Sequence, residues 1–99
     1  MPCIGKAEML FGGYVPANGN SSDITSMAKS AIELKNIFAE GGRVTLVRIK
    51  HSEVQRVSGK NFRFCLRVKQ GKHRFNAKAI VYRDLTGRMM LTQWKPDGC

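Results

Sequence analysis

Few side chains of the 99-residue sequence could take part in covalent or acid–base chemistry. The two histidines, His51 and His73, lie in or beside predicted strands, and no Asp or Glu is placed to orient either beside the thiol of Cys65. Cys65 shares the predicted solvent side of a strand with Arg63 and Arg67. A catalytic thiol needs an oriented base beside it, and the sequence places none there. We therefore interpret both histidines as surface residues and expect no enzymatic activity.

Cofactor and metal motifs are also missing from the sequence. It contains no phosphate-binding loop, no dinucleotide fingerprint and no Cys-x-x-Cys pair, so we expect no cofactor and no metal. The three cysteines, Cys3, Cys65 and Cys99, allow at most one intramolecular disulfide, and the sequence leaves the pairing open. These features are typical of a binding module.

Positive charge is the strongest signal in the composition. Seventeen Lys and Arg residues against seven Asp and Glu residues give a formal net charge of +10. Residues 1–41 carry a net charge of −1, whereas residues 42–99 carry +11. Such a basic region suggests an anionic partner, such as nucleic acid, a heparin-like polymer or a membrane surface. Because no apolar run approaches about 18 residues, we expect no membrane insertion.

A helix is predicted over about residues 23–39. Ser22 or Asp23 is a suitable N-cap, and the glycine pair at 41–42 is a natural stop. Apolar residues recur at three- and four-residue steps and form one stripe. The stripe contains Ile24, Met27, Ala28, Ala31, Leu34 and Phe38, and Ile37 widens its end. Residues 1–20, which are rich in glycine and proline, read as an irregular arm.

The remaining residues are predicted to form four antiparallel strands joined by short turns. They cover residues 44–57, 62–69, 75–82 and 88–94, with turns at 58–60, 70–72 and 84–87. The row Phe62, Phe64, Leu66 and Val68 alternates with polar residues and would face the helix stripe. The expected fold is therefore α+β, with one long helix packed on a four- to five-stranded antiparallel sheet.

Three short segments together resemble the cystatins, the protein inhibitors of papain-like cysteine proteases. Gln55–Gly59 fits the Q-x-V-x-G signature of that family, on the hairpin between the first two strands after the helix. Leu10–Gly13 resembles the N-terminal trunk with its glycine. Tyr82–Gly87 resembles the last hairpin, although Asp84 and Leu85 stand in place of the usual Pro-Trp. The resemblance runs from about residue 10 to residue 94. Within the family, the sequence looks most like the secreted tick salivary cystatins.

The resemblance implies a single cystatin-like domain over residues 1–99, with residues 1–11 as a flexible trunk. It implies a reversible, tight-binding inhibitor of papain-like proteases such as cathepsins L and S, which occludes their cleft with the trunk and two hairpin loops. Phe11 would fill the second subsite, and its bulk favours cathepsin L-like over cathepsin B-like enzymes. The implied protease-binding residues are Leu10, Phe11, Gly12, Gly13, Gln55, Arg56, Val57, Ser58, Gly59, Asp84, Leu85, Thr86 and Gly87.

The cysteines depart from the pattern of secreted type-2 cystatins, which normally have two disulfides in the C-terminal half. Asn76 stands where a paired cysteine is expected, which leaves Cys99 without its usual partner. In disulfide content the chain is closer to the cytosolic stefins. We expect a secreted protein whose signal has been removed, with a cytosolic location as the alternative. We also expect a monomer, with a domain-swapped dimer as the alternative.

The charge supports a second hypothesis, a cationic module on a cystatin fold that binds polyanions or microbial surfaces without inhibiting proteases. The basic residues that would face solvent on the sheet are Arg63, Arg67, Lys69, Lys72, Arg74 and Lys78. The phenylalanines belong to the buried row, so an aromatic platform for nucleic-acid bases is missing. A third hypothesis is a cystatin fold that has lost inhibition, which only Asp84 and Leu85 in place of Pro-Trp favour.

Overall fold

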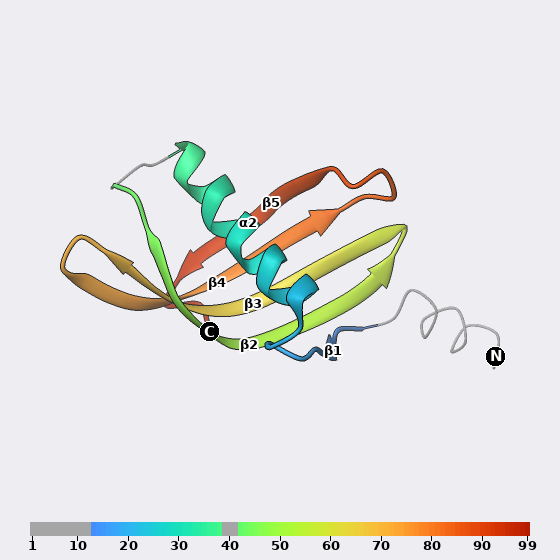
Figure 1. Cartoon of the computed structure of the whole chain (residues 1–99), viewed down its shortest axis with the longest axis horizontal. Coiled ribbons are helices and arrows are strands. Elements are labelled where there is room, and N and C mark those ends of the chain that lie inside the picture. The colour runs from blue at the N-terminus through green and yellow to red at the C-terminus, as the bar shows by residue number, and fades with distance from the viewer. Residues whose placement is uncertain (1–12, 39–41) are drawn as a thin grey trace.

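A computed structural model describes residues 13–38 and 42–99, and it shows one helix packed across a five-stranded antiparallel sheet (Figure 1). The elements are β1 (Val15–Pro16), α2 (Ser22–Phe38), β2 (Thr45–Val57), β3 (Gly59–Gln70), β4 (His73–Arg83) and β5 (Met89–Pro96). The strands lie in chain order, and each pairs antiparallel with the next. The predicted α+β fold is confirmed. Within the described ranges, no helix is long and apolar enough to cross a membrane.

The helix begins at Ser22, one residue before its predicted start at about residue 23. The N–H of Thr25 donates to the carbonyl of Ser21 at 2.9 Å, so Ser21 precedes the first helical residue, and the predicted caps Ser22 and Asp23 lie inside the first turn. An acidic residue in the first turn still stabilises the helix, because it faces the positive end of the helix dipole. The predicted helix end at residue 39 lies outside the described residues.

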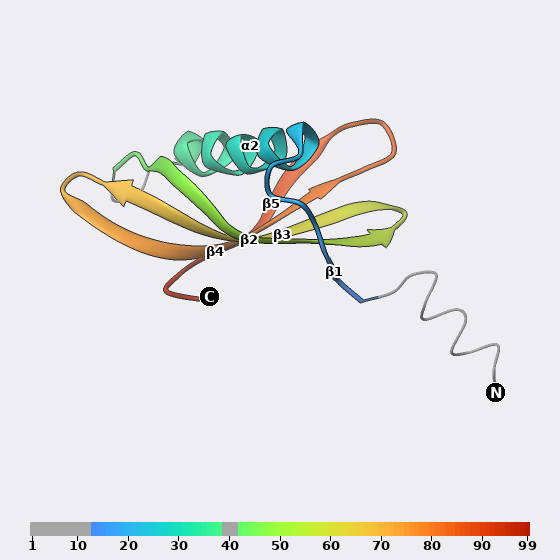
Figure 2. The ribbon, with the colours of Figure 1, turned by 60° about the horizontal axis from the view of Figure 1, so that its bottom comes forward.

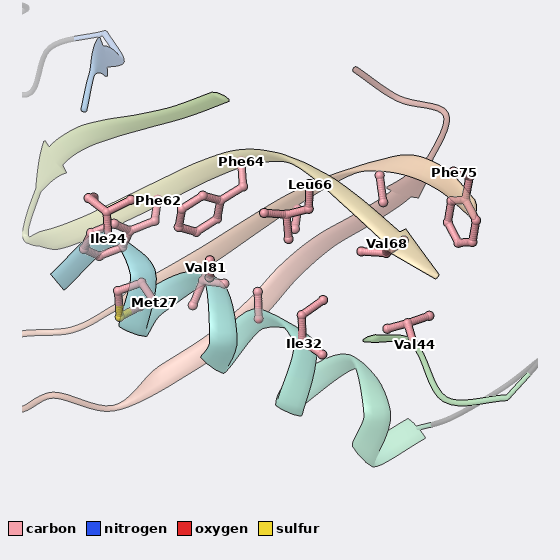
Figure 3. Close-up of a cluster of buried hydrophobic side chains, with 14 residues drawn as sticks. Ile24, Met27, Ile32, Val44, Phe62, Phe64, Leu66, Val68, Phe75 and Val81 are labelled. Atoms are coloured by element: carbon pink, nitrogen blue, oxygen red, sulfur yellow. The ribbon is translucent and has the colours of Figure 1, made fainter. Parts of the chain in front are cut away.

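The core lies between the helix and one face of the sheet (Figure 3). Its buried residues are Ile24, Met27, Ala28, Ala31, Ile32, Val44, Phe62, Phe64, Leu66, Val68, Phe75, Ala77, Ala79 and Val81. The predicted apolar row of β3 is therefore confirmed. Full burial of each large apolar side chain contributes about 1.5–3 kcal/mol, so this row is a main source of stability.

One residue of the predicted helix stripe was wrong. Ile37 is 68% exposed, whereas Ile32, which was left out of the stripe, is buried. The reason is helical geometry, since Ile37 follows the buried Ala28 by nine residues and therefore points about 180° away from it. Ile32 follows Ala28 by four residues and lies on the same face.

The C-terminal segment crosses the face of the sheet opposite the helix (Figure 2). Cys99 forms a disulfide with Cys65 of β3, with a Cα–Cα distance of 5.6 Å. The N–H of Asp97 also donates to the carbonyl of Asn76 at 2.7 Å. The pairing that the sequence left open is thus settled: Asn76 occupies the position of the usual partner, and Cys99 bonds instead to Cys65, which lies on the same face in the neighbouring strand. The last strand also continues to Pro96, two residues past its predicted end.

Candidate functional site

The two predicted hairpin loops lie at the same end of the sheet (Figure 1). The β2–β3 connection is the single residue Ser58, and the β4–β5 connection spans residues 84–88. A hollow of about 390 Å³ between them is lined by Arg56, Val57, Gly59, Lys60, Arg83, Asp84 and Leu85. The structure therefore brings together two segments that are 23 or more residues apart in the sequence.

Gly59 is the residue at which the two loops touch. Its φ of +99° lies in the region that favours glycine, and an added Cβ would overlap the carbonyl oxygen of Arg83 and lie 3.0 Å from the Cα of Asp84. The hydroxyl of Tyr82 also donates a hydrogen bond to the carbonyl of Ser58. The glycine of the signature is therefore needed here both for backbone conformation and for contact between the loops.

The other residues of the first loop form its exposed rim. The side-chain amide of Asn61 donates to Gln55 Oε1 at 2.9 Å, so Gln55 links the two strands of the hairpin. Arg56 and Ser58 are exposed, and Val57 is half-buried. This arrangement holds the main chain of the tip in place while it remains accessible to a partner.

The second loop is fixed by the carboxylate of Asp84. Its Oδ1 accepts hydrogen bonds from the N–H and hydroxyl of Thr86, at 2.8 and 2.6 Å, and from the N–H of Arg88 at 3.0 Å. The bond from the Thr86 side chain, followed by those from the backbone, lowers the pKa of Asp84 because the bonds stabilise its charged form. The loop presents Leu85, which is 82% exposed, as its apolar tip.

The described part of the N-terminal arm runs beside β2 toward the same end. Val15 pairs with Val54 and Pro16 with Glu53 in an antiparallel register, so the arm at Gly13 and Tyr14 points toward the end of β2 that leads into the β2–β3 hairpin. Gly13 is exposed, and an added Cβ there would meet nothing within 4 Å. The predicted site residues Leu10, Phe11 and Gly12 lie outside the described residues.

Sequence reasoning missed Tyr14, which holds the arm on the sheet. The guanidinium of Arg63 lies 3.9 Å from the centroid of the Tyr14 ring, and Arg63 Nε is 2.7 Å from Glu53 Oε1. The hydrogen bond from Arg63 lowers the pKa of Glu53, while burial raises the pKa of Tyr14. Arg63 thus anchors the arm through two partners. No sequence signal indicates this cluster, because its members meet only through strand register.

A second anchor fixes the arm just before the helix. Ser52 is 2% exposed, and its hydroxyl donates to the carbonyl of Ala17 at 3.0 Å. The N–H of Ala17 donates in return to the carbonyl of Ser52 at 2.9 Å. The arm is therefore bound to β2 through both backbone and side chains before it reaches the loops.

Of the six bases predicted on the solvent face, five lie on the sheet face opposite the helix: Arg63, Arg67, Lys69, Arg74 and Lys78. Lys72 is exposed in the turn between β3 and β4. Arg63 lies on the same face but is bound to Glu53 and Tyr14. His51 and His73 are both exposed, as predicted for surface histidines.

Comparisons with known proteins find similarity in three dimensions. No protein-family model matches the sequence, and no curated protein matches it. The structure is similar to that of a salivary cystatin from the soft tick Ornithodoros moubata, with a TM-score of 0.74, 15% identity, and 86% of this chain and 96% of that chain covered. It is also similar to Al-CPI, with a TM-score of 0.68, 14% identity, and 86% and 99% of the two chains covered.

At these identities the similarity establishes the architecture. The helix across an antiparallel sheet extends over nearly the whole length of both known structures. The same architecture was predicted here from the Q-x-V-x-G hairpin, the glycine trunk and the last hairpin. The chain therefore has the cystatin fold.

Proposed function

We propose that this protein is a reversible, tight-binding inhibitor of papain-like cysteine proteases. The observation that carries the proposal is the fixed contact between the loops Gln55–Gly59 and Asp84–Gly87 through Gly59 and Tyr82. These are the two hairpin segments on which the cystatin resemblance rests. The described arm at Gly13 runs toward the same end of the sheet.

The two loops together would act as a preformed wedge. Because Asp84 and Tyr82 already fix the loops, binding would cost little conformational entropy. Leu85 offers apolar surface in place of the usual tryptophan, and Val57 adds to it. The wedge would fill the cleft and cover the catalytic cysteine of the protease, and it needs no reacting group of its own.

The trunk would supply the rest of the interface. In this proposal Leu10 and Phe11 occupy the non-primed subsites, and Gly12 and Gly13 let the backbone pass close to the enzyme. The bulky Phe11 would favour cathepsin L-like over cathepsin B-like enzymes. The inhibition constants of the wild type and of Phe11→Ala against both enzymes test this preference, which equal losses would refute.

We also propose that the protein is secreted. Disulfides persist in oxidising compartments, and the Cys65–Cys99 bond favours such a location over the cytosol. The similarity to a salivary cystatin supports the same proposal. The oxidation state of the two cysteines in protein isolated from its natural source, measured by mass spectrometry after alkylation, tests it.

Inhibition constants against papain and cathepsins L, S and B, measured with fluorogenic peptides, test the main proposal. We expect submicromolar inhibition of papain and a loss of at least tenfold in Leu85→Ala, because Leu85 is 82% exposed in the free protein and burial of a leucine side chain contributes about 1.5–3 kcal/mol. Ile37→Ala is the matched control, because Ile37 is also an exposed aliphatic residue but lies on the helix. Absence of inhibition at 1 µM, or equal effects of the two variants, would contradict the proposal.

A further inference from the structure

The sheet face opposite the helix carries three pairs of bases that lie directly across from each other. The register pairs Arg48 with Arg67, Lys69 with Arg74, and Lys78 with Lys95. Like charges directly opposite each other destabilise a sheet. Together with Lys50 these six side chains form what we call the outer basic face, and none of the seven forms an ion pair with any described residue.

Nearby acids do not neutralise this face. Glu53 lies on the same side of the sheet, but its carboxylate is bound by Arg63 and lies 3.5 Å from His51. Asp97 follows Lys95 in the C-terminal segment, and its carboxylate forms no ion pair with a described base. Arg67 Nη1 donates only to the neutral side-chain oxygen of Asn76, at 3.2 Å. The repulsion among these bases is therefore not relieved within the described parts of the chain.

The same face contains a hollow of about 410 Å³. It is lined by Lys50, His51, Glu53, Arg63, Phe64, Cys65, Lys78, Gly98 and Cys99. The Cys65–Cys99 disulfide holds the C-terminal segment at its edge. Lys50 is brought there by a register shift in β2 between Ile49 and His51. The hollow adds a concave site, with bases from β2 and β4, to an otherwise open sheet surface.

We propose that the outer basic face binds a linear sulfated polysaccharide. A chain with strong acid groups at short intervals complements bases that recur across four adjacent strands, β2 to β5. Single-stranded nucleic acid fits less well, because it also needs exposed aromatic rings on which bases stack. Tyr14 of the arm and Tyr82 of β4 both have partners toward the loop end: Tyr14 contacts the guanidinium of Arg63, and Tyr82 donates to the carbonyl of Ser58.

The position of this face leaves the proposed wedge free. On β3 the paired bases Arg67 and Lys69 lie in the half after Cys65, whereas both hairpin loops lie at the end of the sheet where β3 begins. The C-terminal segment lies on the same side of the sheet as the outer basic face, away from the helix (Figure 2). A bound polysaccharide would therefore concentrate the protein on a sulfated surface without blocking its loops.

Isothermal titration with a heparin-derived octasaccharide at several NaCl concentrations tests the proposal. The variant Lys69→Gln/Lys78→Gln removes two bases from the face, and Lys29→Gln/Arg88→Gln removes two exposed bases elsewhere, with the same net charge. We expect at least a tenfold loss of affinity at 0.15 M NaCl in the first variant and less than a twofold loss in the control. By analogy with nucleic-acid polyanions, the negative slope of log K against log salt should become shallower by about 1.5 in the first variant.

Thermal unfolding gives an independent readout. Removal of repelling bases should raise the melting temperature of Lys69→Gln/Lys78→Gln above that of the control, which also shows that the variant is folded. Equal loss of affinity in both variants would overturn the proposal, because net charge alone would then explain binding. Tighter binding to an oligothymidylate than to the octasaccharide would overturn the choice of ligand. No binding at 0.15 M NaCl would overturn the site itself.

Discussion

The contact between the two hairpin loops can be tested with one pair of glycine substitutions. Gly59 and Gly42 have nearly the same backbone conformation, with φ of +99° and +98°. An added Cβ would overlap the Arg83 carbonyl oxygen at Gly59, whereas it would meet nothing within 4 Å at Gly42. Gly42→Ala therefore measures backbone strain alone, and Gly59→Ala measures strain together with the contact between loops.

The expected magnitudes follow from these two contributions. Backbone strain at positive φ costs about 1–3 kcal/mol, which is the loss of stability expected for Gly42→Ala. Forcing a group into filled space costs about 1–3 kcal/mol more, so Gly59→Ala should lose about 2–6 kcal/mol. In a domain of this size each kcal/mol lowers the melting temperature by about 4–8 °C, so the two variants should be separable.

Urea unfolding followed by circular dichroism measures both losses, and inhibition of papain measures the functional effect. Because one loop must move to admit the methyl group, Gly59→Ala should weaken inhibition at least tenfold, while Gly42→Ala should leave it within twofold. Equal losses of stability in the two variants would refute the argument that the loops are in tight contact. A destabilised Gly59→Ala protein with unchanged inhibition would refute the wedge as a preformed unit.

Three further predictions concern the disulfide, the second loop and the start of β2. In a Cys3→Ser background, Cys99→Ser should lower the free energy of unfolding in urea by about 4 kcal/mol, because the bond closes a loop with a sequence separation of 34; a loss below about 1 kcal/mol would contradict this expectation. The lowered pKa of Asp84 means that its bonds stabilise the fold above its unfolded pKa of about 3.9 and that this contribution is lost as the pH falls through the folded pKa. A carboxyl NMR titration should therefore give Asp84 a midpoint below 3.9, and a midpoint at or above that value would contradict the loop geometry. The amide of Asn36 donates to the Val44 carbonyl at 3.0 Å and accepts from its N–H at 2.8 Å, so Asn36→Ala should cost about 1–3 kcal/mol by thermal unfolding, whereas the exposed Lys29→Ala should cost less than 0.5.

The elements of the fold follow from the sequence because they depend on neighbours along the chain. The alternation from Phe62 to Val68 and the helical spacing from Ile24 to Ala31 each place one apolar face, and both faces are buried. The turns are marked by residues such as Gly71, which adopts a φ of +61° with little strain because it lacks a Cβ. The two hairpin segments of the candidate site were identified from their resemblance to the cystatin motifs, each of which is a short local stretch of sequence.

Other features of the molecule were decided only by the tertiary structure, because they join residues that are distant in the sequence. The disulfide of Cys99 to Cys65, the Arg63 contacts with Glu53 and Tyr14, and the opposed bases of the outer face all require a specific register.

Strand β2 shows the physical reason most clearly. Its register shifts between Leu46 and Arg48 and again between Ile49 and His51, and each shift adds a residue that simple alternation assigns to the wrong face. Both shifts belong to the pairing of β2 with β3. The sequence therefore determined which segments are strands, helix and loops, and the tertiary structure decided which side chains meet across them.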